Sequence, residues 1–412
     1  MICTKRRHLT EISARSSEVN NQAFSHFLSQ SPWDYRLLLD WIRSNGWRLI
    51  GKNGVLIIDE CGTPKSGRKS VGVHRQYCGN LGKVENCQVG VFLAYVKQGA
   101  RILLDFRLYL PYCWINDNNR CDEAGIPESE RVFRTKSELA YEMIVQAVRS
   151  GIRFRHVCMD GFYGTKPWLL TRLDQMNILF VADIKADEHV FINEPKYGIP
   201  SRNGNKGRKK SRVVVTNTSS IRVDKIIEKI TKWRIIRVRT STKGFLEVKF
   251  LAIRVWRIDK EVQKPLPVWL LIRKELDDSE VKYSLSNAIQ IQSWGKLVRM
   301  QSERYWVERV FQDSIDLAGM VDYQVRNWNA WHHHMSLVLL AMFWITKELD
   351  VLSEISKDFT RQDVVQIIRL KLPQKIISPL TVAKKILENH KNRKNSRRSR
   401  MKQKTKLRHS SL

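Results

Sequence analysis

Two carboxylates follow short apolar runs at distant points of the chain. Asp59 ends the run VLIID at 55–59, and Asp160 follows RHVCM at 155–159. In an open sheet, residues beyond the carboxyl ends of neighbouring strands gather at one edge. If these two strands are neighbours, the carboxylates repel one another unless a cation lies between them. Two Mg²⁺ or Mn²⁺ ions would suit such oxygen ligands and could promote phosphodiester cleavage. The alternative is that each acid is an ordinary turn residue or helix cap.

The charge of the chain indicates a polyanionic partner. Its 412 residues include 72 Lys or Arg against 41 Asp or Glu, a net charge of +31. Such a field attracts nucleic acid, or a membrane surface as the rival. We find no apolar span of 18 residues and no signal-peptide core at the N-terminus, so we expect no membrane segment. Seven cysteines without a C-x-x-C pair argue against a disulfide framework and a zinc knuckle, so we expect a protein of the reducing cytoplasm.

Hydrophobic patterns predict an α/β fold with a mixed sheet and flanking helices. The order of elements is β-β-β-α-β-α-β, with a Gly-containing hairpin connection at 97–100. We expect strands at 55–59, 87–96, 101–110, 155–160 and 178–185, and helices at 136–151 and 166–176. The first fifty residues should be largely helical, with Ser31 as an N-cap and Gly46 as a helix end. This segment could contact DNA or simply pack on the next domain.

Five regions follow from changes in composition along the chain. The region between the two halves of the core is rich in strand-forming residues, with a hairpin at 233–258 and a strand at 268–274. Its tryptophans could stack on bases, although core packing is the more common role of such residues. We expect a helical N-terminal segment at 1–50, the first part of the core at 51–187, a β-rich insertion at 188–291, the second part of the core at 292–350, and C-terminal helices with a basic tail at 351–412.

The last third of the chain returns to helical patterns. Residues 302–319 have one apolar face, and the next apolar helix begins with His332, His333 and His334. Consecutive helical residues point to different sides, so these histidines cannot all bind one metal ion. We interpret them as polar residues near a helix start that could contact phosphate. The tail at 391–408 has ten Lys or Arg and no acid, a composition typical of a disordered arm drawn to phosphate.

Several of these segments resemble the bacterial insertion-sequence transposases of the DDE type, and most closely the group called family seven-oh-one. The segment IDECGTPKSGRKSVGVHRQYCGNLGKVENCQVGVFLAYV at 58–96 resembles the first catalytic block, and MDGFYG at 159–164 the second. The third block is RYWVERVFQDSIDLAGMVDYQVRNWNAWHHHMSLVLLAM at 304–342. The resemblance covers most of residues 20–346. It implies an RNase H-like core, interrupted by an insertion domain.

The resemblance also implies site residues and a reaction. Asp59, Asp160 and Glu308 would form the catalytic, metal-binding triad with two Mg²⁺ or Mn²⁺ ions. Asp59 is preferred to Glu60 because the motif uses the first of two adjacent acids. The implied reaction is hydrolysis at the ends of the element, followed by attack of the freed 3′-hydroxyl on target DNA. The implied partners are the terminal inverted repeats, the target duplex and a second copy of the chain.

Basic residues around the three blocks are candidates for holding the DNA. An ordinary solvated basic loop is the competing interpretation of those that follow the first acid. The candidates are Lys65, Lys69, Arg75, Lys83, Arg304 and Arg326. Two other functions remain open on the sequence: a DNA-binding derivative that no longer cuts, and a plain nuclease of the same fold.

Overall fold

The computed structural model describes most of the chain and omits several short segments. It describes residues 12–13, 20–199, 213–228, 230, 232–241, 244–259, 264–277, 279–289, 293–372, 387, 390–391 and 394–395. The predicted arm at 391–408 lies almost entirely outside the described residues. No helix in these ranges is long and apolar enough to cross a bilayer.

The described chain has helices at both ends, and most of its strands follow one another in the runs β1–β4, β6–β10 and β11–β14. The helices are α2 (Asn21–Ser29), α3 (Tyr35–Ile50), α4 (Tyr112–Ile115), α5 (Asn118–Glu123), α6 (Lys136–Arg149), α7 (Gly161–Gly164), α8 (Pro167–Gln175), α9 (Val223–Ile227), α10 (Trp294–Ser302), α11 (Tyr305–Ala318), α12 (Trp328–Ile355) and α13 (Arg361–Lys371). The strands are β1 (Gly54–Pro64), β2 (His74–Cys78), β3 (Lys83–Lys97), β4 (Ala100–Leu108), β5 (Phe154–Met159), β6 (Phe180–Ile184), β7 (His189–Val190), β8 (Tyr197–Gly198), β9 (Val214–Val215), β10 (Ile221–Arg222), β11 (Arg234–Ser241), β12 (Gly244–Ile258), β13 (Pro265–Glu275) and β14 (Val281–Ser286).

The central sheet is mixed, as predicted. Strand β1 pairs with β3 in antiparallel orientation on one side and with β5 in parallel orientation on the other. Strand β6 continues the parallel part beside β5, and β4 pairs with β3 as the second arm of a hairpin. The short strand β2, which the sequence patterns did not predict, also pairs with β3. The core therefore has an antiparallel half and a parallel half that meet at β1.

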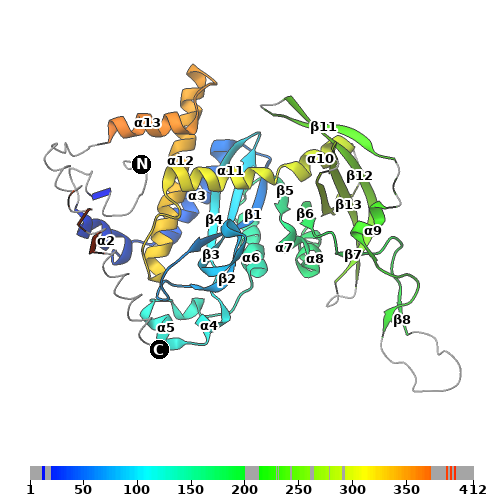
Figure 1. Ribbon diagram of the computed structural model, residues 1–412, viewed down its shortest axis with the longest axis horizontal. Coiled ribbons are helices and arrows are strands. Elements are labelled where there is room, and N and C mark those ends of the chain that lie inside the picture. Colours follow the sequence, from blue (N-terminus) through cyan, green and yellow to red (C-terminus); the bar gives the residue numbers. More distant parts are fainter. Residues whose placement is uncertain are drawn as a thin grey trace.

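The strands of the predicted β-rich insertion continue this same sheet. Strand β14 pairs with β6, and β13, β12 and β11 follow in order, giving ten strands in one sheet among the described residues. Figure 1 shows this extension to one side of the core, beside α9 and α10. The domain limit at 188–291 remains a prediction from composition, whereas the backbone pairing is continuous across it.

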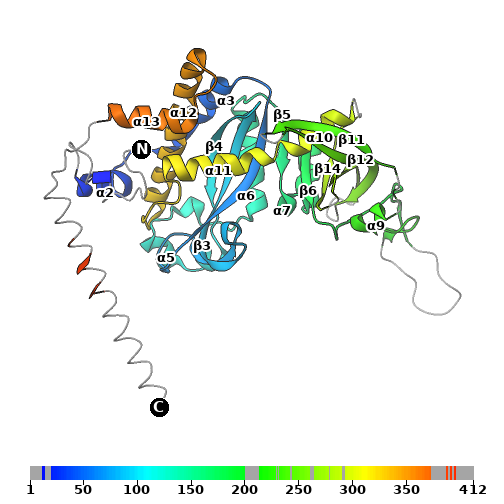
Figure 2. The same ribbon diagram turned by 45° about the horizontal axis from the view of Figure 1, so that its top comes forward.

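Helices cover both faces of the core sheet, which explains why β1 is apolar on both sides. Val55 and Ile57 face a core formed with α3, α11 and α12, while Leu56 and Ile58 face a core formed with α6 and α8. Helix α11 runs across the sheet towards α10 in both orientations of the ribbon (Figures 1 and 2). The alternation of side chains along β1 therefore decides which helices each residue meets.

The N-terminal segment is helical, but its boundaries differ from the prediction. The chain breaks between α2 and α3, and Asp34 rather than Ser31 caps α3 by accepting a backbone hydrogen bond. Helix α3 does not end at Gly46, because this glycine lies buried against β4. A Cβ at Gly46 would lie 2.7 Å from a methyl carbon of Leu104. The last residue of the helix is Ile50, and the residue that follows it, Gly51, has a φ of 99° that is accessible mainly to glycine.

Candidate active site at the sheet edge

The pairing of β1 and β5 brings two of the three predicted acids together where this parallel pairing ends. Asp160 directly follows β5, whereas Asp59 lies in the middle of β1 and does not end the strand as predicted, because β1 continues to Pro64 in its pairing with β3. The register matches Ile58 with Met159, so Asp59 and Asp160 occupy the next positions on neighbouring parallel strands. Asp160 also caps α7, since its carboxylate accepts hydrogen bonds from two backbone N–H groups at 3.0 and 3.3 Å. Because both strands are fixed by buried apolar residues, the two carboxylates are held near each other by the fold itself.

Strand alternation separates Asp59 from its neighbour Glu60. Asp59 has the same parity as Val55 and Ile57, which face α11, and it lies 3.6 Å from Arg304 at the start of that helix. Glu60 faces the opposite helical layer and forms an ion pair with Lys136 of α6 at 2.9 Å. The two adjacent acids therefore have different surroundings, and Asp59 is the one directed towards the helix that carries Glu308.

Electrostatics at Asp59 are unfavourable for a carboxylate. Burial first and the neighbouring Asp160 second raise the pKa of Asp59 to about 7, against an ordinary value of 3.8. Burial also raises the pKa of Asp160. Arg304 works in the opposite direction on both acids, but it does not offset burial. A second cation at this edge would relieve the repulsion that remains.

A fourth acid at the same edge was missed by the sequence analysis. Asp183 lies near the end of β6, one position beyond Ala182, which pairs with Met159 of β5. Its carboxylate accepts a hydrogen bond of 2.5 Å from Ser284 of β14, and burial raises its pKa. The sequence contained a signal for Asp183, because FVADIK, like VLIID, contains an apolar run that is followed directly by an acid. The segment was predicted only as a strand.

Arg304 occupies the centre of this acidic group. Three of its guanidinium nitrogens each contact a different carboxylate: Asp59 at 3.6 Å, Asp183 at 3.0 Å and Glu308 at 3.2 Å. Burial opposes the charge on Arg304, yet the surrounding carboxylates, with Asp183 the strongest, raise its pKa above the ordinary value. The guanidinium is therefore a charged bridge between β1, β6 and α11.

Glu308 is linked to Asp59 and Asp183 only through the guanidinium of Arg304 in the contacts described above. Its side chain is 59% exposed and contacts Arg304, one helical turn earlier on α11. As the side chains stand, no three His, Cys, Asp or Glu residues of the described ranges are close enough together to hold a metal ion. The structure thus brings Asp59 and Asp160 together and places Glu308 at the same edge, on the far side of a guanidinium.

The donor chemistry of this edge fits a divalent cation. Its acidic side chains supply only oxygen atoms, which are the ligands that Mg²⁺ and Mn²⁺ prefer. Burial and, after it, the neighbouring Asp160 raise the pKa of Asp59, and a bound cation would favour the ionised carboxylate. Asp59, Asp160 and Glu308 are the predicted residues that could hold such an ion if their carboxylates came together.

The residues predicted to contact DNA differ in their exposure and in their contacts. Arg75 and Lys83 are exposed near the β2–β3 connection, and Lys83 contacts Glu85 at 3.3 Å. Lys65 is partly buried: its ammonium donates to the carbonyl of Tyr323 at 3.1 Å and lies 3.6 Å from the centre of that ring. Burial lowers the pKa of Lys65 to about 8. Lys65 thus ties the end of β1 to the segment between α11 and α12.

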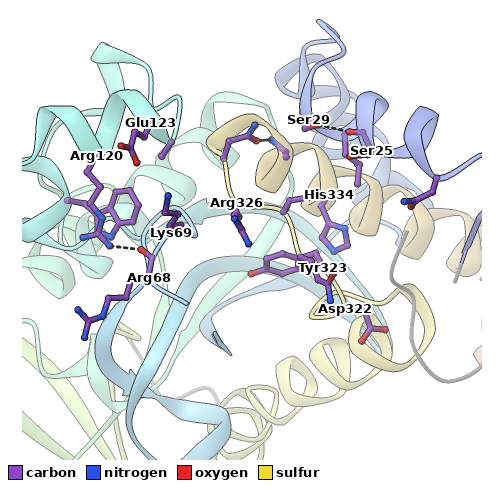
Figure 3. Close-up of a pocket in the computed structure, with 18 residues that line it drawn as sticks. Ser25, Ser29, Arg68, Lys69, Arg120, Glu123, Asp322, Tyr323, Arg326 and His334 are labelled. Carbon is purple, nitrogen blue, oxygen red and sulfur yellow. Dashed lines mark hydrogen bonds between the residues drawn. The ribbon is translucent and has the colours of Figure 1, made fainter. Parts of the chain in front are cut away.

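A cavity of about 720 Å³ opens beside this tie, between α2, α5 and the connection from α11 to α12. Figure 3 shows Lys69 and Arg326 among its lining residues, with Tyr323 and His334 side by side. Lys69 and Arg326 are exposed and come from segments far apart in the sequence. About 20 Å of extended chain separates Asp59 from Lys65, so this basic cavity is distant from the acids.

The three consecutive histidines, which the sequence predicted could contact phosphate, differ in exposure: His332 and His333 are buried, whereas His334 is half-buried and lines the cavity. Both ring nitrogens of His333 lie within 2.9 Å of backbone carbonyls, those of Leu28 and Trp33, and this links α12 to the N-terminal segment. Burial lowers the pKa of His332 to about 3 and that of His334 to about 4. His332 and His333 are interior residues because α12 packs between the sheet and α2–α3.

The fold and the site together define an α/β core in which two acids occupy neighbouring positions on its central parallel strands. The family model described as "DDE superfamily endonuclease" matches residues 1–244, and this chain belongs to that family. Members of the family use divalent metal ions. The predicted resemblance to DDE insertion-sequence transposases is therefore confirmed at the level of the family.

A named relative is similar to part of the chain. A "probable transposase for insertion sequence element IS701" from Microchaete diplosiphon is 32% identical over 194 residues, which is 46% of this chain and 47% of the relative. The matched region thus spans about half the length of that relative. A solved structure of the piggyBac transposase synaptic complex with hairpin DNA aligns with 88% of this chain and 64% of its own, at 13% identity and a TM-score of 0.42.

Proposed function

We propose that this chain is a DDE transposase that cuts DNA at the ends of an insertion sequence and joins the freed ends to target DNA. The observation that carries the proposal is the position of Asp59 and Asp160, each directly after the last paired residues of the parallel strands β1 and β5, with Glu308 linked to Asp59 through Arg304. Family membership and the similarity to the IS701 protein support the same reaction. The net charge of +31 supports duplex DNA as the substrate.

Asp59, Asp160 and Glu308 are the proposed ligands of two Mg²⁺ or Mn²⁺ ions. Bound there, such ions would lower the pKa of an attacking water or 3′-hydroxyl and stabilise the leaving oxygen of the phosphodiester. The chain itself contributes rigidity, since Asp59 and Asp160 are fixed by β1, β5 and α7. In the first step water adds to the phosphorus and releases a 3′-hydroxyl; in the second that hydroxyl replaces a 3′-oxygen of the target strand.

DNA would be held by the basic surface rather than by the acids. Lys69, Arg75, Lys83 and Arg326 are exposed and lie outside the acidic group, so each could contact backbone phosphates. Lys65 would act mainly by fixing the segment that carries Arg326. We further propose that two copies of the chain act together on two element ends, in the bacterial cytoplasm.

Asp160→Asn tests the catalytic assignment. Asparagine still caps a helix but loses the charge, so α7 and the fold should persist while the metal ligand is weakened. We expect cleavage of terminal-repeat DNA to fall by at least about 100-fold, with DNA affinity by fluorescence anisotropy changed less than about twofold. Asp117→Asn is the matched control, because Asp117 caps α5 in the same way but is exposed and distant in sequence.

The products distinguish the proposed function from its alternatives. Purified protein would be incubated with terminal-repeat DNA and Mg²⁺ or Mn²⁺, and with chelator as the negative control. Joined products support a transposase, and degradation alone indicates a plain nuclease. DNA that is bound but intact indicates a derivative that no longer cuts. If Asp160→Asn cuts at the normal rate, the site assignment is wrong.

A further inference from the structure

The acidic edge holds its own cation, and this cation stands where a metal ion would need to be. Three carboxylates surround the Arg304 guanidinium, one on each nitrogen, and they come from β1, β6 and α11. A guanidinium is planar and broad, so it keeps these oxygens apart. This explains why three side chains able to bind metal are not found together among the described residues, although their elements converge.

We propose that Arg304 is an internal counter-cation that a divalent metal ion must displace from Asp59 and Glu308. The proposal rests on the proposed ligand roles of those two acids and adds a competitor for them. With Arg304 in place, the carboxylates are partly neutralised and the buried edge is stable without metal. When Arg304 turns away, Asp59 and Glu308 become free to approach Asp160.

Asp183 is the residue that keeps Arg304 nearby after this exchange. It makes the shortest of the three contacts with Arg304, at 3.0 Å, and it is held in place by Ser284. Ser284 in turn accepts a hydrogen bond of 2.8 Å from Gln301 of α10. Asp183 thus belongs to a fixed network, whereas Glu308 is mostly exposed and able to rotate. We assign Asp183 as a positioning residue that acts through Arg304.

The surroundings of Arg304 allow such a movement without unfolding. It lies at the junction where α10 ends at Ser302 and α11 begins at Tyr305. The helix is fixed by Val307 and Val310, which are fully buried against the sheet. The Arg304 side chain is itself 22% exposed, so water and a hydrated ion can reach it. Only side-chain rotation is required.

Metal binding without DNA tests the exchange directly. Mn²⁺ alone would be titrated into the full chain, with free Mn²⁺ measured by electron paramagnetic resonance. Arg304→Gln removes the competing charge, and we expect Mn²⁺ to bind at least about tenfold more tightly than to the wild-type protein. Adding Asp59→Asn to this variant should abolish the gain, which locates the ion. Equal or weaker binding by Arg304→Gln would overturn the proposal.

A matched control separates competition from general electrostatics. Arg155→Gln also removes one positive charge close to the start of α11, but Arg155 contacts Glu303 at 2.8 Å rather than the acidic group. We expect it to change Mn²⁺ affinity less than about twofold. A gain as large as that of Arg304→Gln would show that net charge alone is responsible and would contradict the exchange.

Asp183→Asn gives a second test that does not depend on the folding of Arg304→Gln. Without Asp183, Arg304 interacts more fully with Asp59 and Glu308, so Mn²⁺ should bind at least about threefold more weakly. In the Arg304→Gln background the same substitution should have almost no effect, as a double-mutant cycle requires for residues that act together. An undiminished effect would make Asp183 a direct ligand and refute its positioning role.

These measurements are independent of DNA cleavage. If the Mn²⁺ affinities follow the expected order and the wild-type protein leaves DNA intact, the proposed function fails and the exchange stands. If DNA is cut but Arg304→Gln binds Mn²⁺ no better than the wild-type protein, the exchange fails and the proposed function stands.

Discussion

Replacing Asp59 by asparagine should stabilise the protein while abolishing its activity. A pKa of about 7 in the folded protein, against 3.8 for an ordinary aspartate, means that folding disfavours the ionised form. At about 1.4 kcal/mol per pH unit, the difference corresponds to about 4 kcal/mol when the carboxylate is ionised in both states. Asparagine cannot ionise, so the variant avoids this cost. This expected gain in the free energy of unfolding applies to the protein without bound metal.

The pH dependence of this gain follows from the sign of the shift. Because the folded state binds the proton more tightly, the contribution of Asp59 is most favourable below pH 3.8 and is lost as the pH rises towards 7. Relative to the wild-type protein, Asp59→Asn should therefore gain about 4 kcal/mol in the free energy of unfolding at pH 8. At pH 5, where only the unfolded state is largely ionised, the gain should be about 1.5 kcal/mol.

Urea unfolding in the presence of chelator would measure both values. The adjacent substitution Glu60→Gln is the control, since it breaks the partly buried ion pair with Lys136 and should destabilise the protein by about 1–3 kcal/mol. Replacing the two neighbouring acids of β1 would then change the free energy of unfolding in opposite directions: Asp59→Asn would raise it and Glu60→Gln would lower it. A variant Asp59→Asn that is no more stable than the wild-type protein at pH 8, or equally stabilised at both pH values, would refute the electrostatic reasoning.

Other predictions concern the elements that hold the site. Asp105 is fully buried and pairs with Arg43 at 2.8 Å and with Arg107 at 2.6 Å. Asp105→Ala should leave Arg43 with only its contact to Asp40 and remove the carboxylate from Arg107, so it should destabilise the protein by about 3–5 kcal/mol in urea unfolding. Gly164→Ala would place a Cβ only 1.8 Å from the carbonyl oxygen of Asp183, so α7 and β6 must separate and cleavage should be lost together with several degrees of melting temperature. Gly67→Ala, where a Cβ meets open space, should leave the melting temperature within a degree of the wild-type value.

The sequence by itself determined the elements and the two principal acids. Apolar runs such as VLIID predict strands because their residues are buried on both faces, and an acid that follows such a run is a candidate site residue. Asp160 directly follows β5 as predicted, whereas β1 continues beyond Asp59 to Pro64. Period-two alternation also required Asp59 and Glu60 to face opposite ways, and the structure shows them against α11 and α6. These conclusions need only local geometry, so they could be reached before any tertiary contact was known.

Only the tertiary structure decided which side chains share the site. Asp183 resembled any strand residue until the pairing of β6 with β5 placed it beside Asp160. Arg304 had been assigned to DNA, yet the packing of α11 on the sheet directs it onto three carboxylates. His332 and His333 of α12 are interior residues for the same reason. Such contacts join residues tens to hundreds of positions apart, and no local periodicity records which elements pack together.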